Sequence, residues 1–167
     1  MSGSVDPVTA RGARAWVALV AFLLAVYAVA AVGALASSDA PALYASLDRP
    51  AWAPPAWLFG PVWTVLYGCI GVAGWLVWRR RAAPHRGRAI TWWVVQLALN
   101  LAWTPLFFGI GAYGLALVEI VLLAAAICVT VACFARVSRA AALLLVPYLG
   151  WVCFAAALNA AIWRANG

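Results

Sequence analysis

Charged residues are scarce in this chain of 167 residues. Asp, Glu, Lys and Arg together make up 9% of it, and lysine is absent. An ordinary soluble domain is about 25% charged and roughly half apolar, whereas 68% of this chain is apolar. A soluble domain near this size buries only about 70% of the surface that its unfolded chain exposes, so it could not hide so much apolar surface. The composition therefore excludes a soluble enzyme, a disordered chain and a secreted disulfide scaffold, and leaves a polytopic membrane protein.

Residues that ligate metals or carry out acid–base chemistry are also few. His85 is the single histidine, Met1 is the single methionine, and the four cysteines fall within apolar runs without metal-finger spacing. Buried thiols usually behave as small hydrophobes, so we expect no disulfide, no metal site and no required cofactor. The sequence contains no hydrolytic triad, carboxylate pair or phosphate-binding loop, which argues against conventional catalysis.

Five apolar runs are long enough to cross a membrane as helices, which takes about 20 residues for a bilayer core near 30 Å. They cover residues 15–37, 57–78, 90–111, 113–135 and 140–163. We predict an all-α membrane protein, a single five-transmembrane-helix bundle over residues 15–164 with an N-terminal segment 1–14. The connection 38–56 is the one long loop, and no room remains for a second domain.

Glu119 is the one charged residue within these runs. An intramembrane carboxyl suggests function by default, and a proton-coupled exporter would require one. Glu119 stands six residues after Tyr113, about 9 Å of helical rise, so its side chain could reach the membrane interface. We expect a structural role rather than proton transfer.

The arginines are distributed unequally between the two ends of an alternating bundle. Arg49 and Arg164 would lie at one end, and nine would lie at the other: Arg11, Arg14, Arg79, Arg80, Arg81, Arg86, Arg88, Arg136 and Arg139. The positive-inside rule then places the N-terminus in the cytoplasm, with the loop 38–56 and the C-terminus on the opposite side. Since the arginines flank apolar runs, topology explains the net charge of +7 better than nucleic-acid binding does.

The first run has a second interpretation. Arg11 and Arg14, an apolar stretch and the sequence Ala34-Leu35-Ala36 together resemble a secretory signal with its cleavage site. The stretch is longer than the 7–15 residues typical of such a signal, which favours a retained helix.

Tryptophan is unusually abundant, with eleven residues. Seven lie near the ends of their runs, as an interfacial aromatic belt would place them: Trp16, Trp57, Trp75, Trp78, Trp92, Trp93 and Trp163. Trp63, Trp103 and Trp151 lie one turn or more inside theirs. Trp63 shares a helix face with Tyr67, and Gly68, Gly71 and Gly74 follow, where another helix could approach closely. These three tryptophans are therefore candidates for the bundle interior.

Polar side chains recur at helical spacing in the third run, where Gln96, Asn100, Trp103 or Thr104, and Phe107 form one stripe. Amides are costly in hydrocarbon unless they are paired, so this stripe should face the interior. Trp151, Ala155, Leu158 and Asn159 form a comparable stripe in the fifth run, where the small residue leaves space.

Prolines interrupt the third and fifth runs and stiffen the long loop. Pro105 and Pro147 should kink their helices, either without further consequence or so as to open a cavity. Pro50, Pro54 and Pro55 make residues 47–57 stiff, which suits a lid over the bundle as well as a merely rigid connection.

Three segments resemble the translocator protein family, also called tryptophan-rich sensory proteins or peripheral-type benzodiazepine receptors. They are LDRPAWAPPAW at 47–57 with GPVWTVLY at 60–67, QLALNLAWTPLFFG at 96–109, and PYLGW at 147–151 with Leu158-Asn159 and Trp163-Arg164. The resemblance covers about Ala15 to Arg164. It implies a five-helix bundle, commonly a homodimer, with a ligand pocket under the loop between the first two helices.

The resemblance also implies ligands and site residues. Family members bind porphyrins such as protoporphyrin IX, haem, sterols, and isoquinoline or benzodiazepine drugs. Trp63 and Trp151 match two pocket tryptophans linked to light-dependent porphyrin breakdown. Other pocket-lining positions match Trp52, Asn100, Trp103, Ala155 and Leu158. The family's sterol motif in the fifth helix lacks its Tyr, because Ala160 and Ala161 occupy the intervening positions.

Taken together, these features predict a tetrapyrrole-binding membrane protein that acts in porphyrin sensing, transport or homeostasis. A flat conjugated ring stacks on indole faces, and Arg49 could pair with porphyrin propionates. Haem would lack an axial His or Met, leaving Cys153 or a tyrosine, so metal-free porphyrin is favoured. The alternative is a photooxidase that uses Trp63 and Trp151, and a small multidrug exporter is a third possibility. The predicted ligand-binding residues are Arg49, Trp52, Trp63, Tyr67, Asn100, Trp103, Phe107, Trp151, Ala155 and Leu158.

Overall fold

Nine helical segments and no strands make up residues 7–167, the part of the chain that the computed structural model describes, with side chains from Arg14 onward. In order they are α1 (Pro7–Leu35), α2 (Ala40–Ser46), η1 (Ala56–Leu58), α3 (Phe59–Trp78), α4 (Arg86–Thr104), η2 (Pro105–Gly109), α5 (Tyr113–Ala135), α6 (Arg139–Leu144) and α7 (Val146–Asn166). Five stretches within residues 7–167 are long and apolar enough to cross a membrane. The predicted all-α class and five spans are confirmed, while residues 1–6 of the predicted N-terminal segment 1–14 lie outside the described residues.

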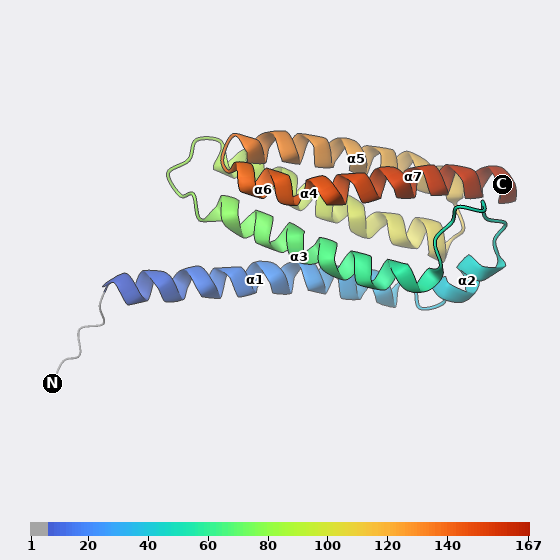
Figure 1. Ribbon diagram of the computed structural model, residues 1–167, viewed down its shortest axis with the longest axis horizontal. Coiled ribbons are helices and arrows are strands. Elements are labelled where there is room, and N and C mark those ends of the chain that lie inside the picture. The colour runs from blue at the N-terminus through green and yellow to red at the C-terminus, as the bar shows by residue number, and fades with distance from the viewer. Residues whose placement is uncertain (1–6) are drawn as a thin grey trace.

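The spans run side by side as one elongated bundle, with α1 along its edge (Figure 1). Helix α5 packs against α4 and α7, and α1 packs mainly against α3. Large apolar side chains cover the outer surface of the spans, among them Trp16 and Leu24 on α1 and Val118 and Leu122 on α5. Such a surface is suited to hydrocarbon, because a helix satisfies most of its backbone hydrogen bonds within the segment and the outward side chains here are apolar.

Glycines of α3 admit the neighbouring helices at close range. A Cβ on Gly71 would lie 3.0 Å from Leu23 of α1, and a Cβ on Gly74 would lie 2.7 Å from the Trp93 ring of α4. Neither position has room for a side chain, so the close helix approach predicted from the glycine spacing is confirmed here.

The prolines for which kinks were predicted lie where helices end or divide. Helix α4 ends before Pro105, where one π-type turn (η2) begins, and Gly111 follows with a φ of 63°. Only glycine adopts that φ without strain, so the third span stops there. The fifth span is divided into α6 and α7 just before Pro147, because proline cannot donate the helical hydrogen bond.

Two helix starts differ from the prediction by more than three residues. Helix α1 begins at Pro7, inside the predicted segment 1–14, and α4 begins at Arg86, before residue 90. Both extensions carry arginine, which the search for apolar runs excluded although arginine is a good helix former. The loop 38–56 also contains a short helix, α2, which the sequence analysis missed.

Trp93 does not belong to an interfacial belt. Its side chain is 6% exposed, and its Nε1–H donates to the Ile70 carbonyl at 3.0 Å. The space that Gly74 leaves open receives the indole ring, so this tryptophan joins α4 to α3. Trp75 has a similar role at the edge of the bundle, where its Nε1–H donates to the Ala15 carbonyl of α1 at 2.8 Å.

Candidate functional site

A cavity of about 620 Å³ lies within the end of the bundle that the 38–56 loop covers. Helices α1, α3, α4, α5 and α7 all contribute to its wall, together with α2 and η1 from the loop side. Its volume falls in the range of pockets that hold small organic ligands. Among the described residues, none that lines it is charged.

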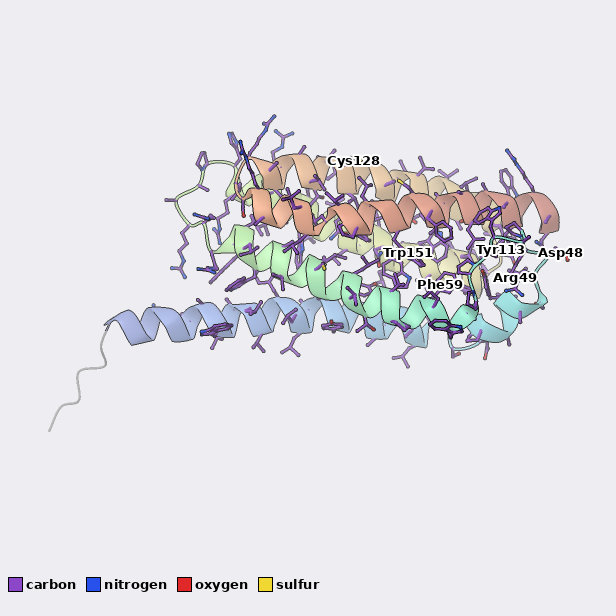
Figure 2. All side chains as sticks on the ribbon, in the orientation of Figure 1. Asp48, Arg49, Phe59, Tyr113, Cys128 and Trp151 are labelled. Atoms are coloured by element: carbon purple, nitrogen blue, oxygen red, sulfur yellow. The ribbon has the colours of Figure 1, made fainter. Side chains whose placement is uncertain are left out.

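Aromatic rings from three helices form much of the wall. Trp63 of α3 lies 5.4 Å from Tyr67 between ring centroids, and Trp103 of α4 meets Phe108 edge to face at 5.8 Å. Figure 2 shows Trp151 and Phe59 close together in the middle of the bundle, where their rings meet edge to face at 5.8 Å. The three tryptophans that the sequence assigned to the interior therefore border one space.

Six of the ten predicted ligand-binding residues line this cavity. They are Trp63, Tyr67, Asn100, Trp103, Trp151 and Ala155. The other four, Arg49, Trp52, Phe107 and Leu158, lie outside the lining. The first six come from α3, α4 and α7, whose predicted stripes the fold brings to face each other.

Phe107 lies behind Trp103 rather than in the wall. Its ring stacks on Trp103 at 4.9 Å and is 2% exposed, whereas the next residue, Phe108, lines the cavity. The prediction assumed α-helical spacing through this segment. The π-type turn at Pro105–Gly109 inserts about one extra residue, which rotates the following side chains and exchanges the two phenylalanines.

Leu158 and Trp52 also differ from the prediction. Leu158 shares the α7 face of Trp151 but lies seven residues further along, about 10 Å of helical rise, and is buried beside Phe107 and Tyr44. Trp52 is half exposed and packs its edge on Phe154 at 5.7 Å, on the outer side of the loop.

Arg49 reaches the cavity indirectly, through Tyr44. Its guanidinium lies 4.5 Å from the centre of the Tyr44 ring, and Tyr44 itself lines the cavity. Burial raises the pKa of the Tyr44 phenol, and the neighbouring Arg49 opposes that rise. The Tyr44 hydroxyl donates to the Pro54 carbonyl at 3.0 Å, which ties α2 to the proline-rich segment.

The loop is fastened to the end of α7. The Asn166 side chain accepts a hydrogen bond from the Asp48 N–H at 3.0 Å and donates one to the Asp48 carbonyl at 2.9 Å. Asp48 and Arg49 lie together at this end of the bundle, near α2 (Figure 2). The stiff loop predicted from the prolines therefore covers the cavity, and two reciprocal bonds hold it there.

The contribution of α1 was missed. Tyr27, Ala30 and Ala34 line the cavity at intervals of three or four residues, with Gly33 beside them and Ser37 just beyond the end of the helix. The α1 positions form one helical stripe of mostly small residues, which is a signal that the sequence carries. It was overlooked because the membrane-spanning part of α1 is apolar on every face, so the stripe does not differ from its surroundings in hydropathy.

A chain of buried hydrogen bonds leads from the cavity wall into the bundle. Tyr67 O–H donates to Asn100 Oδ1, and Asn100 Nδ2 donates to the Tyr148 hydroxyl at 3.1 Å. Tyr148 O–H donates to Gln96 Oε1 at 2.9 Å, and Gln96 Nε2 donates to the Trp93 carbonyl at 2.9 Å. The predicted inward orientation of the amide stripe is confirmed, since Gln96 and Asn100 are buried and paired.

Glu119 is buried within the bundle, so its side chain lacks the exposure that reaching the membrane interface would require. It is 8% exposed on α5, next to the lining residue Ile120, and neither carboxyl oxygen has a hydrogen-bond partner among the described residues. An ionised carboxylate without a partner is very costly in such surroundings, so the neutral acid is the form that fits this site.

The histidine, cysteine and methionine side chains that commonly ligate haem iron do not line the cavity in the described part of the chain. Cys153, the thiol considered from the sequence, is exposed on the outside of α7. Among the described residues, the wall contains no His, Cys or Met, and its possible iron ligands are tyrosines.

Comparison with known proteins gives consistent matches over nearly the whole chain. The family model described as "TspO/MBR family" matches residues 19–164. The human "Translocator protein" is 42% identical over 125 residues, which cover 74% of each chain. "Tryptophan-rich protein TspO" of Archaeoglobus fulgidus is 40% identical over 149 residues (89% of this chain, 96% of the relative). "Tryptophan-rich sensory protein" of Cereibacter sphaeroides is 34% identical over 151 residues (90% and 92%).

Proposed function

Because this chain belongs to the TspO/MBR family, we propose that its cavity binds a flat, apolar tetrapyrrole such as protoporphyrin IX. The protein is a multi-pass integral membrane protein with five spans. In this proposal it acts in porphyrin sensing, transport or homeostasis, with the bound tetrapyrrole as its ligand. Haem, sterols and isoquinoline or benzodiazepine drugs are further ligands to be tested.

The observation that carries this proposal is the cavity of about 620 Å³ with Trp63, Trp103 and Trp151 in its wall. Indole rings offer large apolar faces and favour offset or edge-to-face contact with other aromatic systems. They come from three different helices, so a planar ligand can meet rings on more than one side. The loop over the cavity supplies Arg49, and its guanidinium suits a ligand that has carboxylates on the edge facing the aqueous phase.

Metal-free porphyrin suits the wall better than tightly ligated haem. The three tyrosines that line the cavity are already engaged: Tyr67 donates to Asn100, Tyr27 donates to the Thr64 carbonyl at 3.0 Å, and Tyr44 donates to the Pro54 carbonyl at 3.0 Å. A phenol must lose its proton to become a good iron ligand, and these protons are held in hydrogen bonds.

Titration of the purified protein with protoporphyrin IX tests this proposal. Saturable quenching of tryptophan fluorescence is expected in darkness, because the ligand would lie against the indoles. Metal-free protoporphyrin IX and its iron complex are compared at equal concentration, and the metal-free form is expected to bind more tightly. Quenching no stronger than that of protein-free nanodiscs loaded with free tryptophan would contradict the proposal.

Light-dependent oxidative degradation of the porphyrin is the second candidate function. It is favoured by the position of Trp63 and Trp151, which line the same cavity and could both exchange electrons with an excited ligand. Under illumination, Trp63→Phe and Trp151→Phe would then retain binding but stop the loss of the porphyrin absorption band. If the porphyrin absorption band of the illuminated wild type is as strong as that of a sample kept in darkness, degradation is contradicted and only binding remains as the proposed function.

A further inference from the structure

Five of the seven hydroxyl groups that line the cavity share one property, Ser38 and Thr104 being the other two. Tyr27, Ser37, Tyr44, Thr64 and Tyr67 all line the cavity, and each donates its hydroxyl proton to an oxygen of the protein. Four of the acceptors are backbone carbonyls, and the fifth is the Asn100 side chain. A hydroxyl has one proton and two lone pairs, so these five oxygens can still accept a hydrogen bond but cannot donate another.

Tyr67 is the hydroxyl whose direction is most firmly determined. The Trp93 carbonyl can only accept, so the nitrogen of the Gln96 amide must face it and the Gln96 oxygen must face Tyr148. Tyr148 must therefore donate to Gln96 and accept from the Asn100 nitrogen.

The same constraint then passes to the cavity wall. The Asn100 nitrogen faces Tyr148, so the Asn100 oxygen faces Tyr67, and Tyr67 must donate to it. Reversing any bond of the chain would place two acceptors or two donors against each other. The Trp93 carbonyl of α4 thus determines that the Tyr67 hydroxyl is a donor to Asn100. Hydrogen bonds in such a chain also strengthen one another.

We propose that the part of the cavity wall at Tyr67 selects ligands that carry an N–H or O–H donor there, which the Tyr67 hydroxyl oxygen accepts; the Trp151 Nε1–H, which has no partner among the described residues, is a donor at another point of the wall. A ligand that places only a hydrogen-bond acceptor against the Tyr67 hydroxyl oxygen would bring two acceptors together in an apolar space. Neither could form a hydrogen bond there, and binding would lose the free energy of that bond. In a tetrapyrrole, the groups with this chemistry are the pyrrole or lactam N–H and the protonated propionic acid. The inference rests on the proposed function, since it assumes that a flat aromatic ligand occupies the cavity.

Carbazole and dibenzofuran are suitable probes, because they have the same shape and differ by an N–H in place of an ether oxygen. Binding is measured as the amount retained by protein-loaded nanodiscs minus that retained by empty ones, which removes partition into lipid. The wild type should bind carbazole about threefold to tenfold more tightly than dibenzofuran, the range for one neutral hydrogen bond. Tyr67→Phe should lose this preference through weaker carbazole binding, with dibenzofuran unchanged.

Tyr113→Phe is the matched control, because Tyr113 packs on Phe107 outside the cavity lining and loses the same oxygen. It should retain the wild-type preference. Equal affinity of the wild type for both probes, or a preference that survives in Tyr67→Phe, overturns the inference. If Tyr67→Phe does not fold, the wild-type comparison alone decides.

Protoporphyrin IX is titrated into the same wild-type preparation to separate the two proposals. Porphyrin binding together with equal carbazole and dibenzofuran affinities contradicts the donor rule and leaves the proposed function standing. Absence of porphyrin binding contradicts the proposed function, and a carbazole preference that depends on Tyr67 then still supports the donor rule for smaller aromatic ligands.

Discussion

At the scale of single residues, the cavity combines an uncharged aromatic wall with one cation on the loop that covers it. Arg49 lies over the Tyr44 ring at 4.5 Å, and Tyr44 is both buried and part of the wall. This places positive charge beside the cavity without burying it among the indoles. A ligand with an apolar ring system and a carboxylate edge matches that separation.

Arg49→Ala should weaken binding of protoporphyrin IX by about twofold to fivefold, as expected for one exposed ion pair. Binding of an uncharged isoquinoline drug should change less, because that ligand has no carboxylate. Parallel titrations of both ligands against wild type and variant measure the difference. Equal losses for the two ligands would show that Arg49 acts on the loop and not on propionates.

Glu119→Gln should leave porphyrin affinity within about twofold of wild type, because the carboxyl makes no hydrogen bond that the amide would lose. Thermal stability in detergent should be equal or slightly higher, since a buried ionisable group is replaced by a neutral one. A proton-coupled exporter would instead lose transport entirely in this variant. Loss of drug export from cells that carry Glu119→Gln would therefore favour the exporter.

At the scale of helices, close packing of α3 against α1 and α4 holds one side of the cavity in place. Gly74 marks the point where the Trp93 ring and Phe22 both approach the α3 backbone. Four residues earlier, about one turn away on the same helix, the Ile70 carbonyl accepts the hydrogen bond from the Trp93 indole. The same helix carries Trp63 and Tyr67, so its position sets the geometry of the site.

Gly74→Ala should destabilise the protein by about 1–3 kcal/mol, because the new Cβ would lie 2.7 Å from the Trp93 ring. Gly150→Ala on α7 is the control, since nothing lies within 4 Å of a Cβ there. Thermal unfolding in detergent, followed by tryptophan fluorescence, compares the two. A midpoint equally unchanged in both variants would contradict the close packing described here.

The sequence predicts the spans well because their length and lack of charge are imposed by the bilayer. It also predicts the amide stripe of α4, since Gln96 and Asn100 have no alternative to the interior. It misplaces Phe107, because a π-type turn changes the helical period and nothing in the apolar sequence after Pro105 reveals that. It misplaces Glu119 as well, because residue spacing gives distance along a helix and not the face that packs.

At the scale of the whole molecule, the bundle separates two chemically different ends. The α3–α4 connection and the α5–α6 corner lie at the same end as the start of α1, and the loop 38–56 and the C-terminus lie at the other (Figure 1). The predicted arginine-rich positions 79–88, 136 and 139 therefore share one end. The positive-inside rule predicts that this end faces the cytoplasm and that the loop 38–56 lies on the opposite side.

Single cysteines test this orientation. A membrane-impermeant maleimide should label Ala165→Cys in intact cells and label Ala83→Cys only after lysis. The natural cysteines lie within the spans and serve as the background in the parent protein. Labelling of Ala83→Cys in intact cells, with Ala165→Cys protected, would invert the topology.

The central claim is that a tetrapyrrole occupies the tryptophan-walled cavity, and filling that cavity tests it most directly. Ala155 lines the space on α7, whereas Ala157 on the same helix is exposed on the outer surface. The dissociation constant of protoporphyrin IX should rise at least about tenfold in Ala155→Phe, since a phenyl ring would take the place of the ligand. It should stay at the wild-type value in Ala157→Phe, and unchanged binding in Ala155→Phe would contradict the account.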